Sequence, residues 1–316
     1  MEIQLDNLFT EENEQQRLQV IGEVASELSS ITDMLRWATT EFNKAGLFYG
    51  HGNDNALDDA MALIFPLLSL PLHGATDLMA SRLLLNERKM LVEAVLMRIE
   101  QRIPVAYITN TAWFAGLEFY VDERTLVPRS PFAELIDNKF QPWLTSQPER
   151  ILDMCTGSAC IAIATAYAFP DAYVDALDIS DDALEVAEIN IQGHGLEQQV
   201  IPIQSDLFSE ISDEKYDLII SNPPYVDIED MENLPDEFKH EPALGLESGF
   251  DGLDLVRQML AEAHNMLNDG GLLFVEVGNS QIHLDAAYPH IDFEWITLKS
   301  GGHGIFVISK EQLATI

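Results

Sequence analysis

The sequence contains little cysteine and little histidine, and both scarcities narrow what the protein can be. Its 316 residues include two cysteines, Cys155 and Cys160, which fall in the loop and helix after a predicted strand. Neither position suggests a structural disulfide, and this cysteine usage fits a reducing, cytoplasmic location. The eight histidines are scattered, without the Cys and His spacing of a zinc site, so we expect no metal.

Basic residues are also scarce. Lysine and arginine number 17 against 53 aspartates and glutamates, which gives a net charge of -36. Because affinity for phosphates comes from Lys and Arg, we expect no direct binding to DNA. This excess of acidic residues favours a basic protein partner. Two alternatives are that the acidity only keeps the protein soluble or that it reflects a salty habitat.

Long hydrophobic runs are missing. The longest apolar stretch, 61–72, is short and contains Pro66 and Pro71, so it cannot span a bilayer. The N-terminus lacks the basic region of a signal peptide. With 47% hydrophobic residues, the chain is expected to be globular, with no membrane partner.

The first third of the chain predicts a small helical domain, 1–103. Apolar residues fall at helical spacing from about Glu14 to Phe42, which predicts one long helix. A second helix is expected after Asn55, with a break near Pro66, and a third is expected to start at Asn86, a good N-cap.

The segment 104–129 is rich in β-forming residues, including Val105, Tyr107, Trp113 and Phe119. It predicts a β-hairpin that links two domains. A helix is then expected from about Ala133 to Leu144.

Beyond Glu149, apolar strands alternate with helical segments. This alternation predicts an α/β domain over 130–316, with a doubly wound, mostly parallel sheet. Seven strands are expected, at 151–154, 173–177, 200–203, 218–220, 272–277, 295–298 and near 304–308.

The most distinctive stretch is Asn222-Pro223-Pro224-Tyr225, directly after the strand predicted at 218–220. Ligands bind where the strands of an open parallel sheet end. Proline has a fixed φ and no N–H, and it forces the preceding residue into an extended conformation. The elbow therefore presents free carbonyl oxygens beside the Asn222 amide. These oxygens can accept hydrogen bonds from a planar NH2 group, and the Tyr225 ring offers a flat face for that group to lie against. The alternative is a proline-rich turn with a packed tyrosine.

Two earlier strand ends indicate a nucleoside cofactor. The first strand runs into the small-residue turn 153–159, which lets a ligand approach the backbone, although Asp153 alone could cap that turn. The second strand ends at Asp178, where an acidic residue either accepts the ribose hydroxyls or caps the next helix. No Lys-Ser/Thr pair follows Gly157, so the turn is not a P-loop.

The third strand runs into Ser205-Asp206-Leu207-Phe208. A carboxylate at Asp206 could accept the exocyclic amine of an adenine, with Leu207 or Phe208 against the ring. Alternatively, Ser205 or Asp206 caps a helix.

Taken together, the turn 153–159, Asp178, Asp206 and the elbow 222–225 resemble a class I S-adenosylmethionine-dependent methyltransferase. In this order they resemble the HemK/Prm group of protein-glutamine methyltransferases, over nearly the whole chain. The stretches 50–52, 105–107, 153–157 and 240–242 are most similar to the member that methylates large-subunit ribosomal protein number three. Other stretches that fit the group are 127–129, 241–244 and 251–253.

The resemblance implies a methyl donor, S-adenosyl-L-methionine, and a role for each motif. Asn222 and the Pro223 carbonyl would accept both amide hydrogens of a substrate glutamine, and Tyr225 would stack on the amide. The implied substrate-binding residues are Asn222, Pro223, Pro224 and Tyr225. The implied catalytic residues are Asn222, Pro223 and Tyr225. The implied cofactor-binding residues are Asp153, Cys155, Thr156, Gly157, Ser158, Ala159, Asp178, Ile179, Asp206, Leu207 and Asn222. Of three glycines in the general methyltransferase turn, only Gly157 remains, since Cys155 and Ala159 occupy the other two positions.

Three alternatives stay open. A related enzyme of the same group acts on translation release factors. Adenine amino-methyltransferases use a similar elbow on nucleic acid, but the segment 226–251 holds nine acidic residues and one lysine, which would repel DNA. A ribosome assembly factor without catalytic activity is the third. The implied partner is a basic ribosomal protein, recognised by the domain 1–103.

Overall fold

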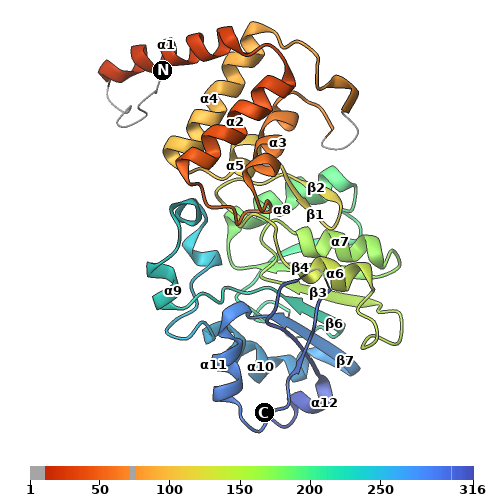
Figure 1. Cartoon of the computed structure of the whole chain (residues 1–316). Coiled ribbons are helices and arrows are strands. Elements are labelled where there is room, and N and C mark those ends of the chain that lie inside the picture. Colours follow the sequence, from red (N-terminus) through yellow and green to blue (C-terminus); the bar gives the residue numbers. More distant parts are fainter. Residues whose placement is uncertain (1–10, 72–75, 212, 300) are drawn as a thin grey trace. The chain divides into compact units, whose positions relative to one another are not determined.

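A computed structural model of the chain describes residues 11–71, 76–211, 213–299 and 301–316. These residues divide into two compact units, which meet in the sequence between Thr111 and Ala112. Each unit has a hydrophobic core of its own. Figure 1 traces the order of the elements along the chain. No helix within the described ranges is both long and apolar enough to cross a membrane.

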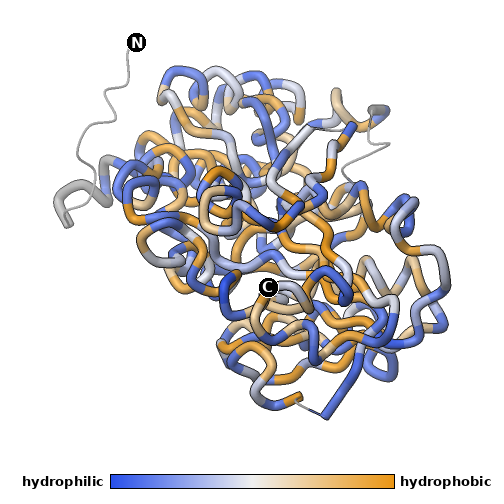
Figure 2. The backbone as a smooth tube through the Cα atoms, turned by 90° about the horizontal axis from the view of Figure 1, so that it is seen from below, coloured by the Kyte–Doolittle hydropathy of each residue, from blue (hydrophilic) through white to orange (hydrophobic). Residues whose placement is uncertain are grey.

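The first unit is helical. Its helices are α1 (Glu11–Glu27), α2 (Ile31–Ala45), α3 (Ala56–Leu67), α4 (Leu85–Gln101) and α5 (Val105–Thr109), with a short 3-10 turn at Thr76–Leu78. Hydrophobic and hydrophilic segments follow one another closely along the backbone (Figure 2). In α2 the buried residues, Ile31, Met34, Leu35, Ala38 and Phe42, recur at helical spacing, as expected where a helix buries one face.

The single long helix predicted for 14–42 is wrong, because the chain breaks between α1 and α2. Ser30 caps α2: its side chain accepts the Asp33 N–H, and the Asp33 carboxylate accepts the Ser30 N–H at 2.9 Å. A capping box marks the start of a helix. Because the break before it leaves the apolar spacing intact, periodicity alone missed it.

The other two predicted helices are found, one with a shifted start. Asn55 caps α3 as expected, and Pro66 lies in its last turn. The third helix begins earlier than predicted, at Leu85, because the Glu87 carboxylate accepts the N–H of Leu84 at 2.7 Å and fixes the first turn there.

Part of the predicted hairpin is also wrong. Val105 and Tyr107 lie in α5, where Val105 is buried in the helical core. Pro104 precedes the helix and Asn110, with φ of 51°, ends it. The hairpin itself is short: β1 (Ala112–Phe114) pairs antiparallel with β2 (Leu117–Phe119).

The second unit contains the predicted mixed seven-stranded sheet, and the predicted fold class is confirmed. Its strand order is β5-β4-β3-β6-β7-β9-β8, with β9 antiparallel to both of its neighbours. The strands are β3 (Arg150–Met154), β4 (Tyr173–Asp178), β5 (Val200–Gln204), β6 (Tyr216–Ser221), β7 (Leu267–Glu276), β8 (Glu294–Trp295) and β9 (Ile305–Ser309).

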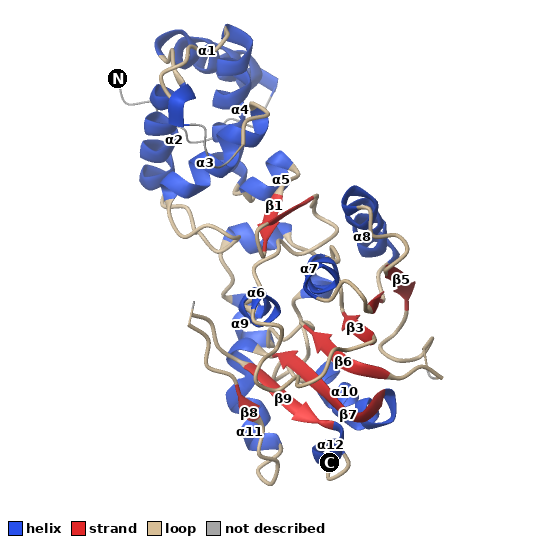
Figure 3. Cartoon of the chain, turned by 90° about the vertical axis from the view of Figure 1, so that its right-hand side faces the viewer, coloured by secondary structure: helices blue, strands red, loops and turns tan. Residues whose placement is uncertain are grey.

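Helices cover both faces of this sheet (Figure 3), with α6, α7 and α8 on one side and α10 and α12 on the other. Alternate strand residues point to opposite faces, so Ile151 and Leu152 belong to different core clusters. The helices of this unit are α6 (Phe132–Asp137), α7 (Cys160–Ala168), α8 (Asp181–His194), α9 (Ile228–Glu232), α10 (Asp254–Met266), α11 (Gln281–Ala287) and α12 (Lys310–Leu313), with 3-10 turns at Asp236–His240, Ala243–Gly245 and Gly278–Ser280.

The helix expected at 133–144 is shorter than predicted, because α6 ends at Asp137. Lys139 and Phe140 take left-handed conformations, and Pro142 cannot continue a helix.

Candidate active site

The parallel strands bring their carboxyl ends to one edge of the sheet. Met154 pairs with Leu177 on β4 and with Ser221 on β6, and Ser221 pairs with Val275 on β7. The chain leaves β3 towards β4 on one side and returns to β6 on the other. This reversal of strand order beside β3 is where open α/β sheets bind ligands.

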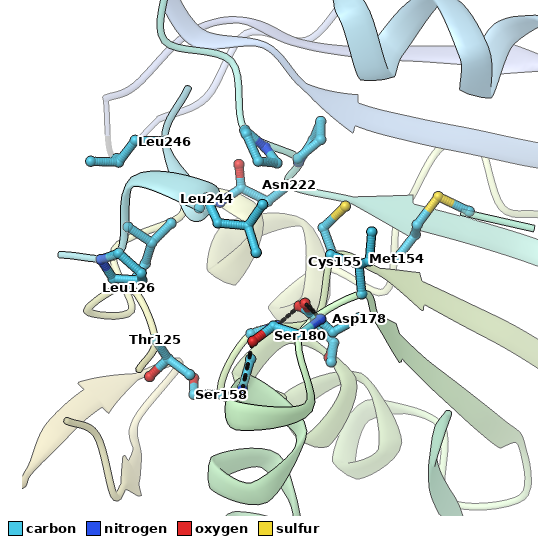
Figure 4. A pocket seen from close by; sticks show the side chains of 18 of the residues that line it. Thr125, Leu126, Met154, Cys155, Ser158, Asp178, Ser180, Asn222, Leu244 and Leu246 are labelled. Carbon is cyan, nitrogen blue, oxygen red and sulfur yellow. Dashed lines mark hydrogen bonds between the residues drawn. The ribbon is translucent and has the colours of Figure 1, made fainter. Parts of the chain in front are cut away.

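A cavity of about 350 Å³ lies at this edge, which is the size of a small-molecule site. It is lined by residues that follow β3, β4, β5 and β6, and by a wall from 124–130 and 234–246. In Figure 4, Leu126 and Leu246 lie on one side of the view, Met154 and Cys155 lie on the other, and Asn222 lies between them.

The turn after β3 bends back on itself through left-handed residues. Cys155, Gly157 and Ala159 have φ of 61°, 56° and 61°. An L-residue in this conformation is disfavoured, by about 1–2 kcal/mol, which explains why glycine suits all three positions. Cys155 and Ala159 take the conformation nonetheless, so the turn is left-handed at all three positions.

Two carboxylates, Asp153 and Asp178, accept hydrogen bonds from this turn. Asp153 is 1% exposed; its Oδ2 accepts the Thr156 hydroxyl at 2.6 Å and the Ala162 N–H at 3.0 Å. Burial raises the pKa of Asp153 to about 7. Asp153 and Ala159 support the turn without lining the cavity.

Asp178 connects the ends of β3 and β4. Its carboxylate accepts the N–H of Gly157 at 2.9 Å and the N–H of Ser180 at 3.0 Å, and burial raises its pKa. Ser180, not Asp178, is the N-cap of α8, so the helix-cap alternative for Asp178 is wrong. Asp178 lines the cavity together with Ile179.

The turn after β5 offers a polar and an apolar side chain. Asp206 is exposed, and Leu207 is buried with a left-handed φ of 48°. Both line the cavity. No helix follows within the described residues between β5 and β6, and the Ser205 hydroxyl donates to the Leu207 carbonyl at 2.7 Å, so the helix-cap alternative is wrong here too.

The elbow after β6 carries an unsatisfied acceptor. The Oδ1 atom of Asn222 is buried and has no hydrogen-bond partner among the described residues. Asn222, Pro223, Pro224 and Tyr225 all line the cavity. A buried polar atom without a partner costs free energy. Because Asn222 lines the cavity, a ligand held there would satisfy this atom by donating a hydrogen bond to it.

Tyr225 is fixed at three points. Its hydroxyl donates to Glu276 Oε1 at 3.1 Å, and its carbonyl accepts the Ser280 hydroxyl at 2.9 Å. A Cβ added at Gly278 would lie 2.7 Å from the Tyr225 ring, so the ring packs directly on that backbone.

The wall opposite the turn is pinned by an ion pair. Arg129 bonds both oxygens of Glu241, at 2.5 and 2.8 Å, and the Val127 N–H donates to Glu241 Oε1 at 3.0 Å. The Arg129 guanidinium also lies 5.2 Å from the centre of the Phe238 ring. Contacts between residues more than 100 positions apart carry no local sequence signal, so the motifs gave no geometric reason to place this wall at the site.

Sequence reasoning missed Glu276, Ser130 and the leucines of this wall. Glu276 is an acidic residue in the last two positions of the strand predicted at 272–277, and it ends β7 in the structure; an acidic residue at a strand end was the available signal. No group of three His, Cys, Asp or Glu side chains suited to a metal is found in the part of the chain that the structure describes.

Three comparisons with known proteins found similar chains. A family model described as a methyltransferase small domain matches residues 138–291. The ribosomal protein uL3 glutamine methyltransferases of Neisseria meningitidis serogroups A and B are each 45% identical to the chain, over 93% of this chain and 97% of theirs. The crystal structure of a methyltransferase from Pyrococcus furiosus shares 19% identity, covers 62% of this chain and 89% of its own, and has a TM-score of 0.45.

Proposed function

Because the chain belongs to the family of ribosomal protein uL3 glutamine methyltransferases, we propose that it transfers a methyl group from S-adenosyl-L-methionine to the side-chain amide nitrogen of a glutamine in uL3. The family, the activity and the methyl donor expected from the sequence are confirmed. The structural observation that carries the proposal is the buried, unpartnered Oδ1 of Asn222 at the switch point of the sheet.

The residues present fit the methyl donor. The left-handed turn 155–159 would hold its methionine part against the backbone. Asp178 already accepts two backbone N–H groups, and a carboxylate has lone pairs left for the ribose hydroxyls. Asp206 and Leu207 would border the adenine, and the cavity volume of about 350 Å³ suits a ligand of this size.

The elbow would orient the substrate amide. An amide nitrogen is a poor nucleophile, because its lone pair is delocalised into the carbonyl. Asn222 Oδ1 would accept one amide hydrogen and the Pro223 carbonyl the other, with Tyr225 against the amide plane. Positioning of this kind can lower a barrier by roughly 7–11 kcal/mol.

When bound, S-adenosyl-L-methionine supplies a methyl group activated by a positively charged sulfur. Positive charge then develops on the amide nitrogen, and the two acceptor oxygens of the elbow would stabilise it. The chain needs no general base before methyl transfer, because the amide proton can leave afterwards.

Recognition of uL3 is assigned here to the helical domain 1–103, with 104–129 as a connecting segment and 130–316 as the methyltransferase domain. Two adjacent leucines support this assignment, since Leu84 and Leu85 are 65% and 50% exposed. The net charge of this chain, -36, also favours a substrate with a basic surface.

The test is incubation of the purified chain with methyl-labelled S-adenosyl-L-methionine and unmethylated uL3, followed by mass spectrometry of the product. We expect one methyl group on a glutamine side chain. A release factor serves as the comparison substrate, and methylation of that protein but not of uL3 would reassign the substrate. Leu84→Ser with Leu85→Ser should raise the KM for uL3 without changing the affinity for the methyl donor.

A further inference from the structure

A buried carboxylate lies behind the elbow. Glu276 is the last residue of β7 and is 5% exposed. Its Oε1 accepts the Tyr225 hydroxyl at 3.1 Å, and its Oε2 accepts the Ser130 hydroxyl at 2.6 Å. All three residues line the cavity. Glu276 therefore joins the elbow to the segment that carries Arg129.

The ionised form of Glu276 accepts both hydrogen bonds, at one oxygen each. When Glu276 is protonated, one of its oxygens carries a hydrogen, so one of the two bonds must reverse its direction. Burial raises its pKa, while Ser130, Tyr225 and the positive charge of Arg129 oppose that rise. Glu241 is a further charged group near the Tyr225 hydroxyl, and it is paired with Arg129.

The remaining freedom of Tyr225 is small. Its carbonyl is held by Ser280, and one side of its ring lies against Gly278. The hydroxyl end is held by Glu276. Removing the Glu276 carboxylate would therefore release the ring and leave a buried hydroxyl without its acceptor, which is unfavourable.

We infer that Glu276 is a positioning residue for methyl transfer, which acts by fixing the ring of Tyr225 beside the substrate amide and by linking that ring to Ser130. The inference rests on the proposed function, because the amide that Tyr225 faces is the proposed substrate. Glu276 itself does not touch the reacting atoms in this scheme.

Kinetics test the inference through three variants of this network. Glu276→Ala should lower kcat about 10- to 100-fold, the loss expected from a small misplacement at the reacting atoms, with unchanged affinity for the methyl donor. Glu276→Gln, which keeps the shape and one acceptor, should lose less. Tyr225→Phe should add little further loss in the Glu276→Ala background, because both changes remove the same contact.

The pH profile separates positioning from a merely structural role. Wild-type kcat should fall on the acid side as Glu276 takes up a proton, and Glu276→Gln should lack that acid limb. The matched control is Glu294→Gln, which loses a carboxylate bonded to Trp143 at 2.6 Å outside the cavity and should keep the wild-type profile.

A substrate-free measurement separates failure of this inference from failure of the proposed function. In protein with ring-labelled tyrosine, the Tyr225 NMR signal, assigned with Tyr225→Phe, should shift with pH in the wild type and in Glu294→Gln but not in Glu276→Gln. If the wild type does not methylate uL3 but the signal behaves this way, the substrate is wrong and the positioning holds. Wild-type kcat in Glu276→Ala, additive losses with Tyr225→Phe, or a Tyr225 signal indifferent to Glu276 would overturn the inference. Should Glu276→Ala fail to fold, Glu276→Gln and Ser130→Ala carry the same test.

Discussion

The backbone of Gly278 lies directly against the ring of Tyr225, so closely that an added Cβ would sit 2.7 Å from Cε2 of the ring. Gly278→Ala should therefore displace the ring and lower kcat about 10- to 100-fold, with the methyl-donor affinity unchanged. Steady-state kinetics with uL3 and calorimetry with the donor measure the two effects.

Gly270→Ala is the matched control, because Gly270 also has a left-handed φ but has open space around its Cβ position. Both variants should lose similar backbone stability. Equal kcat values for the two would show that contact with Tyr225 is unimportant.

The Asn222 carboxamide should be indispensable for transfer. Asn222→Ala removes the buried Oδ1 acceptor, so a substrate amide would lose one of its two orienting contacts. We expect a loss of kcat of at least about 100-fold while the methyl donor still binds. Near-normal turnover would remove the elbow from the mechanism.

Asp178 should matter for the methyl donor rather than for the substrate. Asp178→Ala removes the acceptor of the Gly157 and Ser180 N–H groups and any contact with the ribose. A hydrogen bond to a charged group contributes about 1.5–3 kcal/mol, so donor affinity should fall about 10- to 100-fold in calorimetry. Asp181→Asn, an exposed change at the start of α8, should leave it unchanged.

Asp153 should make the fold less stable as the pH rises. Its pKa is about 7 in the folded protein against 3.8 for an unperturbed carboxyl, so its contribution is fully present below 3.8 and is lost as the pH rises to about 7. The slope is at most about 1.4 kcal/mol per pH unit. Asp153→Asn should lack this loss in denaturant unfolding, and the same pH dependence in both proteins would contradict the burial argument.

Charge should control the encounter with uL3. The exposed acids Glu229, Asp230 and Glu232 on α9 follow the elbow along the chain. The triple variant Glu229→Gln, Asp230→Asn and Glu232→Gln should raise the KM for uL3 about threefold or more at low salt. The KM should also depend less on salt concentration than in the wild type.

The control neutralises three exposed acids that precede β4, β5 and β6, at the opposite edge of the sheet: Asp171, Glu197 and Asp213. Both variants change the net charge equally. A similar KM in the two would mean that overall charge, rather than charge near the elbow, governs the encounter.

The sequence could predict those parts of the fold and site that depend on local pattern. Apolar runs located the strands, and strand ends located Asp178 and Asn222. The apolar spacing could not indicate the capping box at Ser30, because the box leaves that spacing intact. The strand prediction for Val105 is wrong because β-branched residues can also pack in a short helix.

The remaining parts of the site depend on contacts between distant segments. The pair Arg129 and Glu241, and the contact of Glu276 with Ser130, join residues more than 100 positions apart. Such pairs form only once the folded sheet brings distant segments of the chain side by side. The residues next to each partner in the sequence therefore do not indicate the pairing.

One buried amide fastens two distant stretches of backbone. The Asn190 side chain accepts the N–H of Tyr120 at 2.7 Å and donates to the carbonyls of Tyr120 and Ser158. The end of the hairpin and the small-residue turn are thus tethered to a single point on α8. When a nucleoside binds at the turn 153–159 and slows its deuterium uptake, the uptake at Tyr120 should therefore slow as well.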